Sequence, residues 1–255
     1  MVNEGMNEGM NEGMNEGMNE GRSEVVNGPP CSDTACPVPG ALTAGAADKV
    51  LHYIYDPLCG WCYGVATLLQ EARQIEGLGI VMHGGGMMIG HHRRQVSATF
   101  RSYLIQHDHQ IATMTGQVFG DAYFNGLLLD NTTIFDSEPP TTAILAADHL
   151  AGKGLELLKR IQHAHYVLGL RVADVVVLRD LAVAVGLDLA QFDRAFAELG
   201  GAPTQAHITR SRTLLTELGG LGFPTFALQR GERIEMLDTG RFLGKVEAWK
   251  AVLST

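Results

Sequence analysis

Tyr55-Asp56-Pro57-Leu58-Cys59-Gly60-Trp61-Cys62-Tyr63-Gly64 is the stretch that decides the fold. An apolar segment, residues 50–55, leads into it, and a helix-like run over residues 65–75 follows. The order strand, Cys-x-x-Cys, helix places the first sulfur at a helix N-terminus, where unpaired N–H groups and the helix dipole favour an anion. We therefore predict that Cys59 is the attacking thiolate of a disulfide exchange and that Cys62 is the buried resolving thiol.

Cysteines at this spacing also occur in zinc sites and as ordinary buried residues. The strand before the motif and the helix after it favour a redox pair. A closed zinc site would need Cys31 and Cys36 as further ligands beside Cys59 and Cys62. The long Pro- and Gly-rich spacer between the two pairs argues against that site, so we expect no metal.

Composition excludes several partners. The chain has 255 residues, and its 19 Lys and Arg against 28 Asp and Glu give a formal net charge of −9, which argues against nucleic acid. No N-terminal stretch joins basic residues to an apolar segment, and the most apolar region, residues 168–189, is interrupted by charges. We expect a cytoplasmic protein without a membrane segment, and in that reducing compartment cysteines are more often catalytic than structural.

The first 48 residues differ from the rest. Asn-Glu-Gly-Met repeats from Asn3 to Met18, with glycine at every fourth place and no apolar face, so residues 1–48 are predicted to be a disordered tail and linker. The second cysteine pair, Cys31 and Cys36, lies in it. These thiols either pass electrons to and from the first pair or are two inert exposed thiols, and the sequence leaves both possibilities open.

The order of elements predicts an α/β protein. A strand over 50–55, a helix over 62–75 and a strand over 79–83 open the folded part, and a hairpin of strands 223–228 and 234–237 with a helix over 243–253 closes it. Between them lie helix candidates over 93–107, 111–119, 140–151, 154–168, 174–185, 190–199 and 204–218. This order predicts a thioredoxin fold, residues 49–88 and 220–255, with an inserted all-helical domain over 89–219.

With these elements placed, the string 55–64 resembles the DsbA family of thioredoxin-like proteins, and most of all its cytoplasmic branch of predicted disulfide isomerases related to FrnE. Glu138-Pro139-Pro140, His163-Ala164-His165-Tyr166 and Gly222-Phe223-Pro224-Thr225 are also similar to that branch. The resemblance implies exchange with disulfide- or thiol-containing protein substrates. It further implies a low-molecular-weight thiol or a thioredoxin-system reductant as electron partner, and no cofactor.

The resemblance also gives Pro224 a role. It implies a cis Phe223–Pro224 bond in the loop facing the catalytic helix, so that the backbone of Phe223 faces Cys59 and pairs with an extended substrate. The alternative is a trans proline that opens an edge strand. Two departures limit the transfer. Gly60-Trp61 contains no histidine between the cysteines, which predicts a less oxidising pair.

The second departure is Tyr53, which stands where many thioredoxins carry a buried acid. Asp56 or a water molecule is the candidate proton acceptor in its place. Near the motif, Leu58, Trp61 and Phe223 are predicted to form a small exposed apolar surface for unfolded chains. Gly84-Gly85-Gly86, after the second strand, is a place where backbone could approach a substrate.

Two further functions are possible. A glutathione-dependent isomerase or transferase of the kappa class shares the fold, but those relatives generally keep one nucleophile, often a serine, and the intact pair of cysteines disfavours this alternative. The histidine clusters 91–92, 107–109 and 163–165 suggest metal binding at first sight. Residues i and i+2 of a helix point to different sides, so we interpret these histidines as surface or core residues.

Overall fold

The structure is a computed structural model that describes residues 49–255. The tail predicted to be disordered, with Cys31 and Cys36, lies outside the described residues. The strands are β1 (Lys49–Tyr55), β2 (Leu78–Gly84), β3 (Arg94–Gln95), β4 (Ile134–Phe135), β5 (Thr225–Arg230) and β6 (Arg233–Leu237). The helices are α2 (Gly60–Gly64), α3 (Ala66–Ala72), α4 (Ala98–Thr115), α5 (Asp121–Phe124), α6 (Glu138–Ala151), α7 (Gly154–Tyr166), α8 (Val175–Ala184), α9 (Leu189–Leu199), α10 (Ala202–Glu217) and α11 (Val246–Ser254).

The main sheet has the strand order β2-β1-β5-β6. β1 and β2 are parallel, with Tyr55 beside Gly84, whereas β5 is antiparallel to β1, with Ile54 beside Thr225. The ends of β1 and β2 and the start of β5 therefore meet at one edge of the sheet. The loops 56–59, 85–88 and 222–224 consequently converge there, although they are far apart in the sequence.

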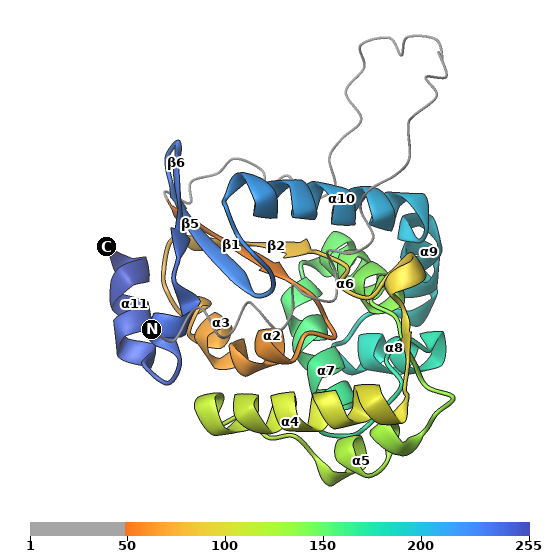
Figure 1. The fold of residues 1–255 in the computed structure, drawn as a ribbon. Helices are drawn as coiled ribbons and strands as arrows, with labels where there is room; N and C mark the ends of the chain where they lie inside the picture. The colour runs from red at the N-terminus through yellow and green to blue at the C-terminus, as the bar shows by residue number, and fades with distance from the viewer. Residues whose placement is uncertain (1–48) are drawn as a thin grey trace, which may run out of the picture.

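Helices cover both faces of this sheet. Figure 1 shows α2 and α3 on one face and α10 on the other, and α11 packs against α3. The aromatic residues of the first face form one cluster. The Tyr53 and Phe226 rings are stacked with their centres 4.7 Å apart, and the Phe226 and Trp249 rings meet edge to face at 5.1 Å. The Trp249 indole N–H also donates to the Leu68 carbonyl at 2.8 Å, which ties α11 to α3.

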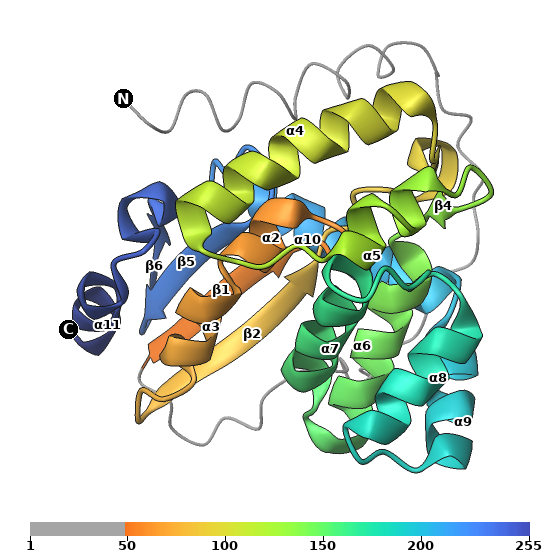
Figure 2. The same cartoon turned by 90° about the horizontal axis from the view of Figure 1, so that it is seen from below.

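The segment between β2 and β5 supplies the remaining helices. Figure 2 shows α4 running across α2, while α6 to α9 gather beyond the end of the sheet. α6 begins at Glu138, slightly before the start predicted at residue 140, and has prolines in its first turn, where their missing N–H groups cost no helical hydrogen bond. The fold class, a thioredoxin fold with inserted helices, is confirmed. The division into residues 49–88 with 220–255 and 89–219 as separate domains stays a prediction, and α4 and α10 pack directly on α2 and β2.

Three of the predicted helices were wrong in their bounds. The candidates over 93–107 and 111–119 form one helix, α4, because nothing between them interrupts the backbone hydrogen bonds. Its N-cap is Ser97, whose Oγ accepts from the Phe100 N–H at 3.2 Å, and it ends at Gly116, where φ is +72°. The helix predicted over 62–75 is divided at Val65 into α2 and α3. Among the described residues, no helix is both long and apolar enough to span a bilayer.

One buried histidine makes the stability of this fold depend on pH. His165 on α7 is 2% exposed and lies among the rings of Tyr123, Phe135 and Tyr166. Burial lowers its pKa from 6.5 to about 3. Below pH 6.5 the unfolded chain binds a proton at this position while the folded chain does not, so stability is present above that pH and is lost as the pH falls toward 3.

We therefore predict that the free energy of unfolding falls on acidification, with His165 contributing about 1.4 kcal/mol per pH unit over this range. His165→Leu should reduce the slope measured by urea unfolding at several pH values. His163→Gln, at an exposed position of the same helix, is the control and should leave the slope unchanged. An identical slope in wild type and His165→Leu would contradict the assignment.

Candidate active site

Cys59 caps the N-terminus of α2. Its backbone is extended, and its Sγ accepts a hydrogen bond from the Cys62 N–H at 3.4 Å. The residue lies in the loop that leaves β1, at the sheet edge where the three loops converge. The position is the one that the strand, motif and helix order predicts, and an N–H group at this position stabilises negative charge on sulfur.

The loop before β5 faces the same sulfur. The Cys59 thiol donates to the carbonyl oxygen of Phe223 at 3.4 Å, across 164 positions of sequence. The Phe223–Pro224 bond is cis, as the resemblance implied. The structure thus brings together Cys59, Cys62, Phe223 and Pro224, which the sequence singled out separately.

Cys62 has a different environment from Cys59. It is fully buried, and its Sγ accepts from the backbone N–H of Asp56 at 3.5 Å. Burial, followed by the neighbouring Cys59, raises the pKa of the Cys62 thiol well above its usual value. The second thiol is therefore held protonated and enclosed.

Tyr53 occupies the position at which many thioredoxins carry a buried acid. Its hydroxyl donates to the Cys62 carbonyl at 3.3 Å, and burial raises its pKa well above 10. The phenol stays neutral, so Tyr53 supports the backbone of α2 and carries no charge.

The Asp56 carboxylate joins the loops of the site. Oδ1 accepts from the Leu58 N–H at 2.8 Å and from the Ser137 hydroxyl at 2.9 Å, and Oδ2 accepts from the Met87 N–H. Burial raises its pKa, and these three hydrogen bonds act in the opposite direction. These donors lie in loops or at the start of a helix, so the Asp56 carboxylate holds together the segments that surround the motif. Within the described residues it makes no hydrogen bond to Cys62 through the carboxylate, and its role as proton acceptor stays a prediction.

Trp61 points into the helices of the insert. Its indole N–H donates to Nε2 of His107 at 3.1 Å, and Nδ1 of His107 lies 3.4 Å from Oδ1 of Asp108. Oδ2 of Asp108 in turn accepts from the Tyr123 hydroxyl at 2.7 Å. A continuous polar chain therefore runs from the dipeptide between the cysteines into α4 and α5.

Gly60 permits this close approach of α4. A Cβ at this position would lie 2.8 Å from both Oδ1 of Asp108 and Cδ1 of Ile111, closer than side chains pack. A larger side chain at position 60 would therefore clash with α4, which explains why the motif has a glycine there.

The prediction that Leu58, Trp61 and Phe223 form an exposed apolar surface is wrong. These residues are 4%, 5% and 8% exposed, because α4 and the loops of the sheet edge cover them. The prediction that the backbone of residues 84–86 could approach a substrate is also wrong. The space beside Gly85 is filled by the Phe223 ring, 2.1 Å from where a Cβ would lie. The carbonyl of Gly85 accepts from Arg212 at 2.7 Å, which fixes this loop from α10.

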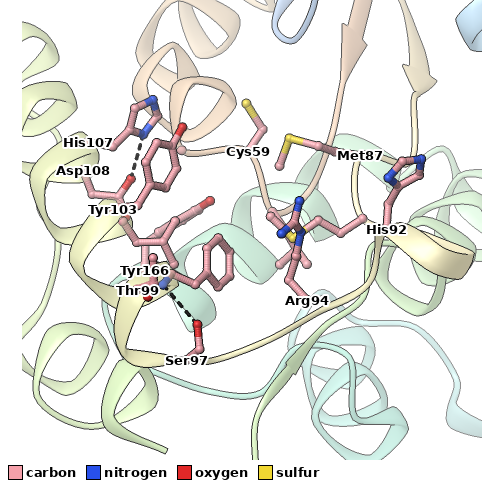
Figure 3. A pocket seen from close by; sticks show the side chains of 15 residues that line it. Cys59, Met87, His92, Arg94, Ser97, Thr99, Tyr103, His107, Asp108 and Tyr166 are labelled. Atoms are coloured by element: carbon pink, nitrogen blue, oxygen red, sulfur yellow. Dashed lines mark hydrogen bonds and ion pairs between the residues drawn. The ribbon is translucent and has the colours of Figure 1, made fainter. Parts of the chain in front are cut away.

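Two cavities flank the motif. One of about 510 Å³ is lined by Cys59 and Gly60 on the side of the insert, and Figure 3 shows its residues. The other, of about 280 Å³, is lined by Trp61, Phe223 and Pro224 on the side of β5 and β6. The thiol of Cys59 is therefore accessible through a cavity although the residue is only 2% exposed.

Sequence analysis missed the contribution of α4. The histidine cluster 107–109 was interpreted as surface or core residues without a role at the motif, and Asp108, which is 1% exposed, was not singled out. The available signal was the spacing of Leu104, Asp108 and Ile111, which places a carboxylate on the apolar face of the helix. Within residues 49–255, no cluster of three or more His, Cys, Asp or Glu side chains is arranged to hold a metal ion. The four-cysteine zinc site involves Cys31 and Cys36, outside the described residues.

Comparisons with known proteins find similar chains only among solved structures. No protein-family model matches the chain, and no curated protein is similar enough to be matched. Among solved structures, the cytosolic disulfide reductase DsbM from Pseudomonas aeruginosa is 50% identical, with a TM-score of 0.75 over 80% of this chain and 96% of that one. The same protein in a structure with GSH gives a TM-score of 0.74 over the same shares of both chains, also at 50% identity.

A protein from Nitrosomonas europaea described as a putative protein disulfide isomerase is 26% identical, with a TM-score of 0.68 over 80% of this chain and 95% of that one. The identity and coverage of the Pseudomonas aeruginosa reductase show the family. This chain is a disulfide oxidoreductase and belongs to the DsbA family of thioredoxin-like proteins, in the FrnE-like branch.

Proposed function

We propose that the protein reduces disulfides of protein substrates in the cytoplasm, with Cys59 as the nucleophile and Cys62 as the resolving thiol. The observation that carries the proposal is the asymmetry of the two sulfurs. Cys59 Sγ lies at a cavity wall between the Cys62 N–H and the Phe223 carbonyl, whereas Cys62 is enclosed. The cytoplasmic location and the direction of electron flow are supported by the similar Pseudomonas aeruginosa protein, described as a cytosolic disulfide reductase.

The reaction proceeds in two exchanges. The Cys59 thiolate attacks one sulfur of the substrate disulfide, a mixed disulfide forms, and the other substrate sulfur leaves as a thiolate that takes up a proton. Cys62 then loses its proton and attacks the Cys59 sulfur, which releases the second substrate thiol. The enzyme ends as a Cys59–Cys62 disulfide, and the substrate has gained two electrons and two protons. Because burial raises the pKa of Cys62, this thiol does not compete for the first attack.

Regeneration requires two thiols that reduce the Cys59–Cys62 disulfide. We propose glutathione for this step, which converts two glutathione molecules to glutathione disulfide. The support is the structure of the similar reductase with GSH. A less oxidising pair, as the Gly60-Trp61 dipeptide predicts, is consistent with reduction of substrates.

Protein substrates bind on the β5–β6 side of the motif in this proposal. The Phe223 carbonyl lies at the sulfur, so an extended peptide can pair with the backbone there. Beside it, the 280 Å³ cavity is lined by Leu221 and Met236, which are 64% and 46% exposed. Exposed apolar side chains next to a backbone carbonyl that faces the sulfur suit an unfolded or flexible chain.

We predict that Cys59→Ser lowers glutathione-driven reduction of insulin by roughly three orders of magnitude or more, because no nucleophile remains. Cys62→Ser should instead accumulate a mixed disulfide between Cys59 and the substrate, visible by non-reducing electrophoresis and mass spectrometry. Both variants are made with Cys31 and Cys36 replaced by serine, so that tail thiols do not react.

The same variants distinguish the glutathione-dependent isomerase or transferase. That chemistry needs one nucleophile, so it would persist in Cys62→Ser with conjugation of glutathione to an electrophile. Full insulin reduction in Cys59→Ser would refute the catalytic assignment.

We also predict that Leu221→Glu raises KM for insulin about three- to tenfold, because burial of the leucine against a substrate peptide is lost. Reduction of the small hydroxyethyl disulfide should be unchanged, since that substrate does not reach Leu221. Val176→Glu, at a 67% exposed position on α8, is the matched control. An equal effect of the two variants on insulin would rule out the β5–β6 side as the peptide site.

A further inference from the structure

The larger cavity lies on the opposite side of Cys59 from the proposed peptide site. It has a volume of about 510 Å³, and no residue that lines it also lines the cavity beside Pro224. In Figure 3, side chains of α4 line one side, Met87, His92 and Arg94 line the other, and Cys59 lies between the two. A hollow of this size fits a small molecule.

Most of its wall is apolar. Met87 and Met88, from the loop after β2, line the cavity together with Phe100, Tyr103 and Leu104 of α4. Figure 3 shows Met87 across the cavity from Tyr103. Thioether sulfur makes favourable contacts with aromatic rings, and a flexible methionine adapts to a flat group. The wall therefore suits an aromatic ring that is delivered to the sulfur of Cys59.

One cation in this wall has no ionic partner. Arg94 is exposed, and among residues 49–255 no carboxylate lies within ion-pair distance of it. The neighbouring Arg93 differs, because its Nε is 2.9 Å from Oδ2 of Asp136.

The other polar groups of the cavity do not neutralise the positive charge of Arg94. The Asp108 carboxylate, which also lines it, is engaged by the Tyr123 hydroxyl at 2.7 Å and by His107 at 3.4 Å. Burial lowers the pKa of His92, followed by the effect of His91, so this imidazole stays neutral. A ligand that matches this cavity carries a negative charge that pairs with Arg94 and an apolar ring that contacts the methionines and the aromatic residues.

We propose that this cavity is a second substrate site, which binds small aromatic disulfides bearing a carboxylate. The ring lies between the methionines and Phe100, and the carboxylate binds Arg94. The proposal rests on the exchange chemistry proposed above and adds a substrate class to it. Glutathione fits this wall less well, because it offers no aromatic ring to the methionines.

The reaction at this site is balanced without an added reductant. Cys59 attacks one sulfur of the aromatic disulfide and releases one aromatic thiolate. Cys62 then attacks the Cys59 sulfur and releases the second. The reduced protein loses two electrons to become the Cys59–Cys62 disulfide, and two protons pass to solvent or remain on the released thiols according to pH.

The test is a single-turnover experiment on the reduced full chain with Cys31 and Cys36 replaced by serine. Two probes share an aromatic disulfide and differ in charge: 5,5′-dithiobis(2-nitrobenzoate), which carries carboxylates, and 2,2′-dithiodipyridine, which does not. Stopped-flow absorbance follows release of the aromatic thiols against probe concentration. We expect saturation with the charged probe. Arg94→Gln should raise its half-saturating concentration about tenfold, through loss of a charge-assisted hydrogen bond, and leave the limiting rate unchanged.

Three controls make the outcome decisive. The uncharged probe should react equally with wild type and Arg94→Gln, which also shows that the variant is folded, and Arg94→Lys should restore part of the affinity for the charged probe. Arg93→Gln should leave both probes unaffected. An equal effect of Arg93→Gln and Arg94→Gln, or a linear concentration dependence with both probes, overturns the proposal. Loss of all thiol release in Cys59→Ser supports the exchange chemistry separately, so failure at Arg94 leaves the proposed function standing.

Discussion

The antiparallel pairing of β1 with β5 is the constraint on which the site depends. Ile54 lies beside Thr225, so the loop that leaves β1 meets the loop that enters β5, and Cys59 faces the Phe223 carbonyl. A slip by one residue would shift the strands by about 3.3 Å and turn every side chain to the other face. The stacked rings of Tyr53 and Phe226, opposite each other in the register, oppose such a slip because both are fully buried.

The same edge creates the difference between the two thiols. Cys59 is the cap of α2 and touches a cavity, whereas Cys62 is one turn inside and lies against the Asp56 backbone. Placing a thiolate in a fully buried position costs free energy, which is why the pKa of Cys62 is raised. Two identical side chains thus acquire different environments from position alone, since one is at the end of a helix and the other is within it.

The sequence was sufficient for features that local chemistry determines. The motif between strand and helix and most helix bounds were predicted correctly, because caps, turns and periodicity act over a few residues, whereas the cis Phe223–Pro224 bond was implied by the family resemblance. The sequence was not sufficient to predict which element covers the Cys-x-x-Cys motif. Trp61 was expected at the surface, but its indole is held by His107, 46 positions away. Hydrophobic periodicity gives the buried face of a helix and not the element that covers it, so the contact of α4 with Gly60 could not be derived from spacing.

The position of the insert explains how α4 can cover the motif without changing the strand pairing that positions the two sulfurs. The chain leaves the sheet after β2, on one side of β1, and returns at β5, on the other side, so both ends of the insert lie at the catalytic edge. Lengthening a connection costs little further closure entropy, and the register of the strands does not depend on what lies between them. The insert supplies α4, which covers Trp61 and forms a wall of the larger cavity, while the sulfurs and the Phe223 carbonyl remain on the sheet unit. The two sulfurs are therefore positioned by strand pairing, and one wall of the larger cavity beside Cys59 belongs to a segment that can change independently.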